Sequence, residues 1–274
     1  MSPEPTAADL LATVTASPRA VSAHDRKAWV DLFTENATVN DPVGSTPHIG
    51  RAAIERFYDT FIAPNTITFD VAHDFIARDP DGPASILRDL TIRITMSTGA
   101  AVHVPMHLRY ELAQVAGELR IDHLAAHWEL PAMVRQLMRT GAAGWVAGAK
   151  LGRLLVRNQG IAGPVGMARA YRNVGRTGRR RALELSTAAG RGDGDAVSEA
   201  TGHGSALLWS GNRISPTEFA ERARGWRRGK TITAGRTITA SVELADGPGL
   251  VMLEFAPTTP RIETVRVHTE IVPH

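Results

Sequence analysis

Asp41 and a small group of histidines are the residues best suited to chemistry in this chain, which contains no cysteine. Asp41 precedes Pro42 and a glycine-containing turn, where an aspartate most simply serves as a turn residue. A carboxylate held against apolar side chains would instead be a competent base near neutral pH. Without cysteine, disulfides, thiolate metal sites and cysteine nucleophiles are excluded.

Two histidine pairs have a spacing that would suit a metal ion on a helix. They are His103 with His107 and His123 with His127. Both pairs fall in segments with the period of a strand, where four residues span about 13 Å. Ligands so far apart cannot share an ion with bonds of about 2 Å, so we expect no metal at either pair. We also expect no other cofactor.

The first 130 residues change from helical spacing to a period of two. Residues 7–34 predict two helices, or one bent near Pro18, and residues 51–62 predict another, with an extended segment at 37–43 between them. Strands are predicted near 66–77, 83–97, 101–112 and 118–129. Helices followed by antiparallel strands favour an α+β domain with helices packed on one face of a curved sheet.

The same order of elements returns near the end of the chain. Residues 182–200 and 215–228 predict helices, and strands are predicted near 231–244, 249–256 and 260–272. Residues 131–181 predict helix with glycine interruptions. We therefore expect three parts: a domain at 1–130, a basic helical connector at 131–181, and a second, shortened copy of the first fold at 182–274.

The sequence around Asp41 resembles the catalytic stretch of bacterial ketosteroid isomerases. Residues 36–45 read NATVNDPVGS, and the likeness continues without a gap through Pro47, Gly50, 52–54 (AAI) and 57–58 (FY). Similarity of pattern to the wider nuclear-transport-factor-2-like, or SnoaL-like, superfamily extends to about Glu129. The resemblance implies a cone-shaped α+β fold and a Δ5-3-ketosteroid isomerase reaction, with Asp41 as the proton carrier.

The resemblance also shows where this chain departs from the family. That family pairs its Asp base with a Tyr and a protonated Asp that donate to the oxyanion, and here Ser17 and Met106 stand at those two positions. Methionine donates nothing, and a serine hydroxyl is far less acidic than a phenol. Tyr58 matches a tyrosine that supports the oxyanion network in some members of the family, so we predict it as a second catalytic residue.

Other residues are predicted to line an apolar pocket. They are Phe33, Phe57, Phe61, His107, His123 and His127, in addition to Ser17 and Met106. His107 would take the place of Met106 if the strand register were shifted by one residue. Each histidine has an alternative role as an outward-facing or core strand residue. An apolar cavity with one carboxylate suits a small apolar molecule such as a steroid or polycyclic ketone.

The connector is strongly basic. Residues 130–183 contain no Asp or Glu but include Arg135, Arg139, Lys150, Arg153 and Arg157, with further arginines up to Arg181. This pattern fits a solvated helix face or a peripheral contact with anionic lipid. We expect no nucleic-acid partner, because no recognition module is present.

The second copy shows no carboxylate where Asp41 would recur. Residues 202–209 read GHGSALLW, and the next carboxylate is Glu218. We expect a structural role for this copy, pairing with the first domain within the chain, and the oligomeric state stays open. His203 would be a turn residue between two glycines.

Two functions therefore remain open. One is a steroid Δ-isomerase-like enzyme, and the other is a noncatalytic steroid- or lipid-binding protein that has lost the oxyanion hole. The N-terminus lacks the basic run and apolar core of a signal peptide, and no stretch reaches the roughly 18 apolar residues of a membrane span. We expect a cytoplasmic location, with membrane association as the alternative.

Overall fold

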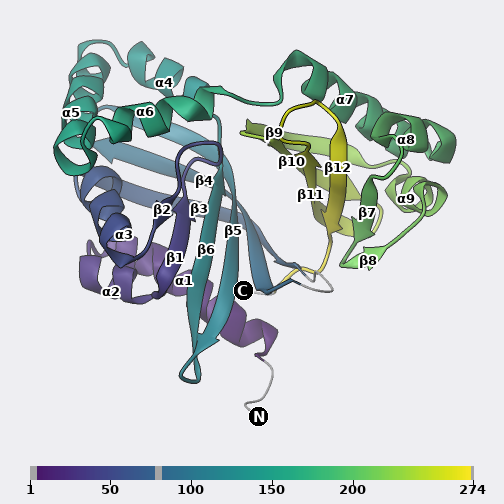
Figure 1. The fold of residues 1–274 in the computed structure, drawn as a ribbon, viewed down its shortest axis with the longest axis horizontal. Helices are drawn as coiled ribbons and strands as arrows, with labels where there is room; N and C mark the ends of the chain where they lie inside the picture. Colours follow the sequence, from purple (N-terminus) through teal and green to yellow (C-terminus); the bar gives the residue numbers. More distant parts are fainter. Residues whose placement is uncertain (1–4, 78–81, 273–274) are drawn as a thin grey trace.

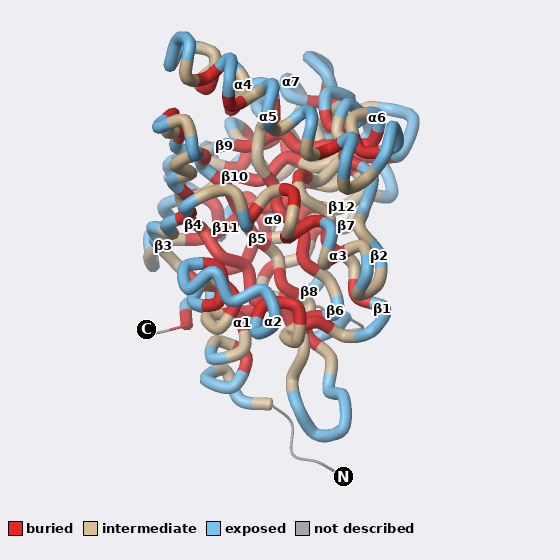
Figure 2. The backbone as a smooth tube through the Cα atoms, turned by 90° about the vertical axis from the view of Figure 1, so that its left-hand side faces the viewer, coloured by how far each residue is buried: buried red, intermediate tan, exposed pale blue. Residues whose placement is uncertain are grey.

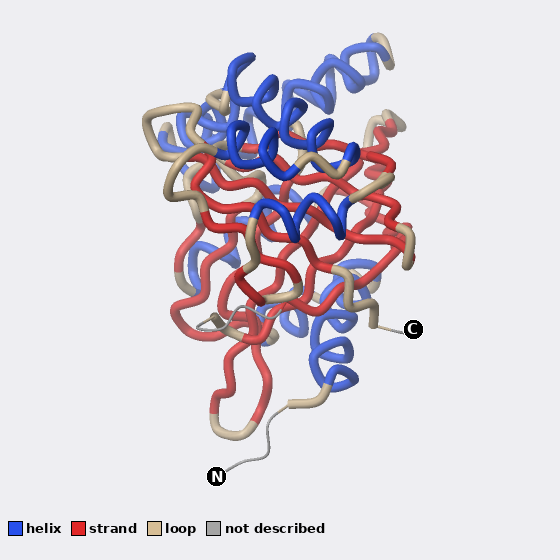
Figure 3. The backbone as a smooth tube through the Cα atoms, turned by 90° about the vertical axis from the view of Figure 1, so that its right-hand side faces the viewer, coloured by secondary structure: helices blue, strands red, loops and turns tan. Residues whose placement is uncertain are grey.

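Two six-stranded sheets lie back to back, each covered by helices on the face turned away from the other sheet (Figure 1). We call the helix-covered face of each sheet its inner face, and the face turned to the other sheet its outer face. The computed structural model describes residues 5–77 and 82–272. Figure 2 shows that buried residues gather on the strands, whereas the outer turns of the helices are exposed. The molecule is thus layered as helices, sheet, sheet and helices (Figure 1), and Figure 3, viewed from the side of the second domain, shows helices lying in front of the strands.

The first sheet has the strand order β2-β1-β6-β5-β4-β3, in which β1 and β6 are parallel and all other neighbours are antiparallel. The elements of this domain are α1 (Ala7–Ser22), α2 (Arg26–Asp31), β1 (Phe33–Asn40), β2 (His48–Ile49), α3 (Arg51–Phe57), a π-helical turn η1 (Tyr58–Ile62), β3 (Asn65–Ala77), β4 (Ala84–Met96), β5 (Ala101–Val115) and β6 (Glu118–His127). Helix α1 begins with a capping box between Thr6 and Asp9 and continues through Pro18. The predicted strands and the helix at 51–62 are confirmed.

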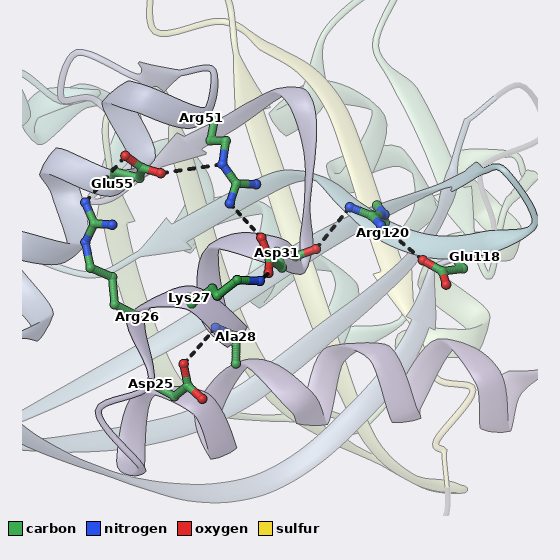
Figure 4. A network of polar contacts seen from close by, with 9 residues as sticks. All are labelled: Asp25, Arg26, Lys27, Ala28, Asp31, Arg51, Glu55, Glu118 and Arg120. Atoms are coloured by element: carbon green, nitrogen blue, oxygen red, sulfur yellow. Dashed lines mark hydrogen bonds and ion pairs between the residues drawn. The ribbon is translucent and has the colours of Figure 1, made fainter.

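A polar network joins α2, α3 and β6 at one end of the cone (Figure 4). The Asp31 carboxylate accepts from Lys27 Nζ and from Arg51 Nη2, each at 2.6 Å. These two cationic donors lower the pKa of Asp31 to about 2. Arg120 on β6 donates to the Asp31 carbonyl oxygen at 3.3 Å, so one residue connects two helices to the sheet.

The connector consists of α4 (Leu130–Arg139), α5 (Ala142–Gln159), α6 (Ala162–Ala168) and a short 3₁₀ turn η2 (Arg169–Tyr171). We call α4, α5 and α6 the lid helices, because they lie across one end of the first domain (Figure 1). Gln136 fixes α4 by exchanging hydrogen bonds with the backbone of His103 on β5. Asn158 fixes α5 by donating to Thr60 Oγ1 at 3.1 Å.

The second domain repeats the topology of the first, with the strand order β8-β7-β12-β11-β10-β9 and a parallel pair β7/β12. Its elements are α7 (Gly175–Arg191), α8 (Gly194–Thr201), β7 (Ala206–Trp209), β8 (Asn212–Arg213), α9 (Pro216–Ala223), β9 (Arg227–Ala234), β10 (Thr237–Leu244), β11 (Gly247–Phe255) and β12 (Ile262–His268). The predicted second copy of the fold is confirmed. Helix α7 already begins at Gly175, so the boundary proposed at residue 181 falls inside a helix.

Aromatic side chains fill the core of the second domain. Phe219 on α9 is fully buried and packs edge-on against Trp209 and Trp226, with ring centroids 5.7 and 5.9 Å away. Strand β7 has only four residues, half the length of its counterpart β1. The turn after β7 carries Ser210 and Gly211 rather than a carboxylate, so this copy has no counterpart of Asp41.

The outer faces of the two sheets meet through a buried polar cluster. His107 of β5 contacts Thr239 Oγ1 through Nδ1 at 2.7 Å and Ser241 Oγ through Nε2 at 3.0 Å. Lys230 of β9 forms an ion pair with Asp89 and donates to the carbonyl oxygen of Leu90 at 2.7 Å. Burial lowers the pKa of His107 to about 3, so its ring is neutral at physiological pH. The two copies therefore pair within one chain.

The turn that follows Asp41 is held from two sides. On one side, Thr46 N donates to the Gly166 carbonyl of α6 at 3.2 Å. On the other side, Gly44 lies against Gly235 in the β9–β10 hairpin, where an added Cβ on either glycine would come within 2.9 Å of the other residue's Cα. Both the lid helices and the second domain thus restrain the segment that carries the carboxylate.

We expect Gly235→Ala to destabilise the protein beyond the cost of its left-handed backbone. Gly235 has φ +52° and Gly225 has φ +78°, but only Gly235 has a neighbour within 4 Å of an added Cβ. The left-handed conformation costs alanine about 1–2 kcal/mol at either position, and the contact with Gly44 adds to this at Gly235. Urea unfolding of the two variants would measure the difference, and equal losses would contradict the contact.

Candidate active site

A cavity of about 450 Å³ lies between the inner face of the first sheet, α1, η1 and the lid helices. Its walls are largely apolar. They include Val21, Phe57, Phe61, Ile67, Phe69, Ile92, Ile94, Met96, Val104, Met106, Leu108 and Leu124 from the cone, and Leu130, Met133, Leu137, Leu151, Leu155 and Met167 from the lid helices. The polar side chains in the wall are few, and Asp41 is the only carboxylate among the described lining residues.

The parallel pair β1/β6 brings Asp41 to the cavity. Parallel strands end at the same edge of a sheet, and Asn40 is in register with Ala125. The chain therefore leaves β1 at Asp41 beside the residues that follow β6. Val43 N donates to the Ala126 carbonyl at 2.8 Å and fixes the turn against β6. Trp128, just after β6, then lies next to the carboxylate.

The Asp41 carboxylate accepts a hydrogen bond from Trp128 Nε1 at 2.5 Å. Burial raises the pKa of Asp41 from 3.8 to about 6, although the Trp128 hydrogen bond opposes this effect. The side chain faces the cavity and is withdrawn from bulk water. A carboxylate with such a pKa is mostly ionised at neutral pH and yet basic enough to accept a proton from carbon.

Three polar side chains lie together in another part of the wall. Ser17 Oγ accepts from Trp29 Nε1 at 3.1 Å, and the Ser17 hydroxyl is close enough to Tyr110 to lower the pKa of its phenol. All three residues line the cavity. The cavity wall therefore contains a phenol, that of Tyr110, as well as the Asp41 carboxylate.

A buried ion pair lies behind Tyr110. Arg88 binds the Asp74 carboxylate with two parallel hydrogen bonds, 2.7 Å from Nε and 2.8 Å from Nη2, and both side chains are almost fully buried. Burial raises the pKa of Tyr110, and the positive charge of Arg88 acts in the opposite direction. The carboxylates of Asp74 and Asp41 also raise the pKa of Tyr110, so the guanidinium offsets only part of these effects.

The structure brings five of the predicted site residues together at the cavity: Asp41, Ser17, Phe57, Phe61 and Met106. Met106 faces inward because β5 alternates, with Val104, Leu108 and Tyr110 on the same face. The strand register inferred from the sequence therefore places the methionine, and not His107, in the cavity.

Two aromatic predictions do not hold as cavity-lining positions. Tyr58 is one residue beyond Phe57 on the helix and so turns away from the cavity, packing on Trp29 with centroids 5.6 Å apart. Phe33 packs edge-on against the same indole at 4.7 Å and belongs to the core. Burial raises the pKa of Tyr58, and its hydroxyl has no hydrogen-bond partner among the described residues.

The three histidines predicted near the substrate lie on the outer face of the sheet. His107 is part of the contact with the second domain. His127 donates through Nδ1 to the carbonyl oxygen of His107 at 3.3 Å. His123 pairs with Glu111 at 3.5 Å. Residues of β6 alternate, so Leu124 faces the cavity and its odd-numbered neighbours face away. No group of three His, Asp or Glu residues suited to a metal ion occurs in the ranges 5–77 and 82–272.

Sequence reasoning missed Trp128, Tyr110 and the lid. Trp128 follows His127 and keeps the alternation of β6, and Tyr110 is four residues after Met106 on the same face of β5. The alternation of inward- and outward-facing residues along each strand indicated both positions. On α5, Gly148, Leu151 and Leu155 are spaced along one helical face that lines the cavity. Trp145, on the same helix, lies outside this face and is 67% exposed.

Comparison with known proteins identifies the class of the first domain. Residues 14–119 match the family model described as a SnoaL-like domain. This segment contains Ser17, Asp41, Met106 and Tyr110, and extends from α1 into β6. The resemblance recognised in the sequence is confirmed at the level of this family.

Similar solved structures each cover less than half of this chain. A Δ5-3-ketosteroid isomerase from Mycobacterium sp. is 29% identical and covers 46% of this chain and 96% of its own, with a TM-score of 0.40. A Mycobacterium tuberculosis protein solved in complex with estradiol-17beta-hemisuccinate is 27% identical over 45% and 95%, with a TM-score of 0.40. A computationally designed 17-OHP binder is 25% identical over 45% and 95%, with a TM-score of 0.40.

We expect Asp41→Asn to stabilise the protein at pH 8 and to have little effect at pH 4. The folded-state pKa of about 6 lies above the unfolded value of 3.8, so the ionised carboxylate lowers stability increasingly as pH rises through this interval. Above it the gain should be about 2–3 kcal/mol. Urea unfolding at both pH values measures it, with the exposed Asp70→Asn as control. An equal effect at both pH values would mean that Asp41 is not desolvated.

Proposed function

We propose that the first domain is a steroid Δ-isomerase-like enzyme that transfers a proton within a Δ5-3-ketosteroid or a similar polycyclic ketone. The observation that carries this proposal is the carboxylate of Asp41, ionised but with a raised pKa, in an otherwise apolar cavity. The SnoaL-like family match supports an isomerase-type function at the level of the family.

In the proposed reaction, Asp41 removes a proton from the carbon between the carbonyl and the double bond. The electrons of that C–H bond shift toward the carbonyl oxygen and form a dienolate. Asp41 then returns the same proton to the carbon two positions further along, which leaves a conjugated enone. The enzyme ends in its starting protonation state, so no cofactor or water is consumed.

Tyr110 is the proposed donor to the dienolate oxygen. Ser17 accepts from Trp29 and can donate its own proton to the Tyr110 oxygen, which leaves the phenol proton free to point into the cavity. The positive charge of Arg88 partly offsets the effect of the Asp74 and Asp41 carboxylates on the negative charge that develops along this chain. This arrangement would supply the donor that Met106 cannot.

The shape and polarity of the cavity support a polycyclic substrate. A volume of about 450 Å³ lies within the usual range for small-molecule sites, and the walls are mostly aliphatic and aromatic. A rigid apolar ring system would bury well here, with one carbonyl near the phenol. A highly charged substrate would lose its hydration without adequate replacement.

A noncatalytic steroid- or lipid-binding protein is the second candidate. Met106 favours it, because an apolar side chain occupies the position where the family has its protonated aspartic acid. A binder would use the same cavity, but it would not need an ionised Asp41. The two functions therefore differ in what the carboxylate does.

We expect the wild-type protein to form the conjugated enone from a Δ5-3-ketosteroid, measured by ultraviolet absorbance. Asp41→Asn should abolish this activity, because the amide cannot accept the proton. Tyr110→Phe should lower kcat by about 100-fold or more, the usual effect of losing an oxyanion donor. Tyr58→Phe is the matched control, since that buried phenol lies outside the cavity wall.

The outcomes separate the candidates. If the wild-type protein binds steroid but isomerises it no faster than Asp41→Asn does, only the noncatalytic binding function remains. A loss in Tyr58→Phe without a loss in Tyr110→Phe would assign the donor to Tyr58 instead.

We also expect kcat/KM to fall on the acidic side of about pH 6, as Asp41 becomes protonated. Trp128→Phe removes the hydrogen bond that lowers the pKa of Asp41, so this acidic limb should move to higher pH. The exposed Trp145→Phe should leave it in place. Steady-state rates measured between pH 4 and 9 test this, and an unshifted limb in Trp128→Phe would show that the indole does not tune the base.

A further inference from the structure

The outer surface of the lid helices combines exposed apolar side chains with unbalanced positive charge. Ile161, at the N-terminus of α6, is 80% exposed, and Trp145 on α5 is 67% exposed. Val156 and Val165 are also exposed. Several large apolar residues exposed on two adjoining helices indicate an interaction surface.

Helix α5 has two distinct faces. Gly148, Leu151 and Leu155 line the cavity. The exposed residues Trp145, Ala149, Arg153 and Val156 follow one another at helical spacing on another side, and Val146, Lys150 and Arg157 continue that exposed face. An amphipathic helix of this kind is apolar toward its own domain and mixed apolar and basic toward the outside.

The positive charge on this surface is not neutralised locally. Residues 130–183 contain eleven Lys and Arg residues and no Asp or Glu. In the part of the chain that the structure describes, Arg135, Arg139, Lys150, Arg153 and Arg157 form no ion pair with a carboxylate. Arg179 and Arg180, further along the chain, do pair with Glu129 and Glu184. The lid surface is therefore complementary to a negatively charged partner.

The chemistry of this surface selects among possible partners. A second copy meeting the same face would place like charges against each other, which is unfavourable. A purely solvated face would account for the arginines but not for Trp145 and Ile161. An anionic bilayer accounts for both the arginines and the exposed apolar residues. Headgroup phosphates attract arginine, and the boundary with the acyl chains accepts tryptophan and isoleucine.

We propose that α5 and the start of α6 dock on the surface of a bilayer that contains anionic lipid. Trp145, Ile161 and Val165 enter the headgroup–acyl boundary, and Arg153 and Arg157 contact phosphates. The proposed contact is peripheral, with these helices lying on the bilayer surface. No helix in the described ranges is long and apolar enough to cross a membrane. This surface is separate from the proposed proton-transfer site, so it can be tested independently.

Docking there would place the cavity opening next to the lipid. Gly152, Ala168 and Tyr171 are exposed and also line the cavity, so the cavity reaches the surface on the lid side. An apolar ligand that partitions into the bilayer could then enter between the lid helices with little contact with water. The lid would serve both as the cover of the site and as its membrane contact.

Cosedimentation of the full chain with sucrose-loaded vesicles tests the proposal. The vesicles contain phosphatidylcholine alone or with about one third phosphatidylglycerol, at about 0.1 M salt. We expect binding only to the anionic vesicles, with weaker binding at about 0.5 M salt. The paired substitutions Arg153→Glu/Arg157→Glu should reduce binding tenfold or more. Trp145→Ser/Ile161→Ser should reduce it severalfold with the same salt dependence retained.

Arg227→Glu/Arg228→Glu is the matched control. These two exposed arginines lie on β9 of the second domain, and the substitution changes net charge by the same amount. Their variant should bind as the wild type does. Equal loss in both charge variants, or no wild-type binding at low salt, would overturn the proposal. Thermal unfolding establishes that each variant is folded, and isomerase assays with dissolved steroid would be unaffected by loss of docking alone.

Discussion

The desolvation of one carboxylate is the constraint on which the site depends. Burial raises the pKa of Asp41, and a single indole hydrogen bond partly compensates the ionised form. If the cavity filled with water, the carboxylate would return to its ordinary acidity and become a weak base. Every wall of the cavity would therefore contribute to the proposed proton transfer, including walls that never touch the reacting atoms.

Three parts of the chain build that environment together. The cone supplies Asp41 and Tyr110, the lid helices close the apolar space, and the second domain supports the sheet from behind. Lys230 bonds to the carbonyl oxygens of Leu90 and Met106, so it braces the two strands directly behind a cavity wall. The turn after Asp41 lies between α6 and the β9–β10 hairpin. The site is thus a property of the whole chain.

The sequence predicted the fold and part of the site wherever apolar residues recur at helical or strand spacing or a family motif is present. The resemblance around the NDPVGS turn pointed to Asp41 and placed Met106 at a pocket position, and the alternation of β5 in the structure explains why Met106 faces the cavity. The sequence could not show that His107 meets Thr239, because a contact between residues far apart in sequence leaves no local pattern. The lid was missed for a related reason: helix spacing gives α5 an apolar face but does not say what that face covers.

The covalent tandem of two similar folds has a further consequence. Separate subunits associate only to the extent that their concentration allows, whereas two copies on one chain remain paired at any dilution. The sheet face that carries His107 is therefore covered even in a scarce protein. Two copies on one chain also need not have the same sequence. The second copy could therefore fill its core with the packed rings of Trp209, Phe219 and Trp226, while the first kept Asp41 in its cavity.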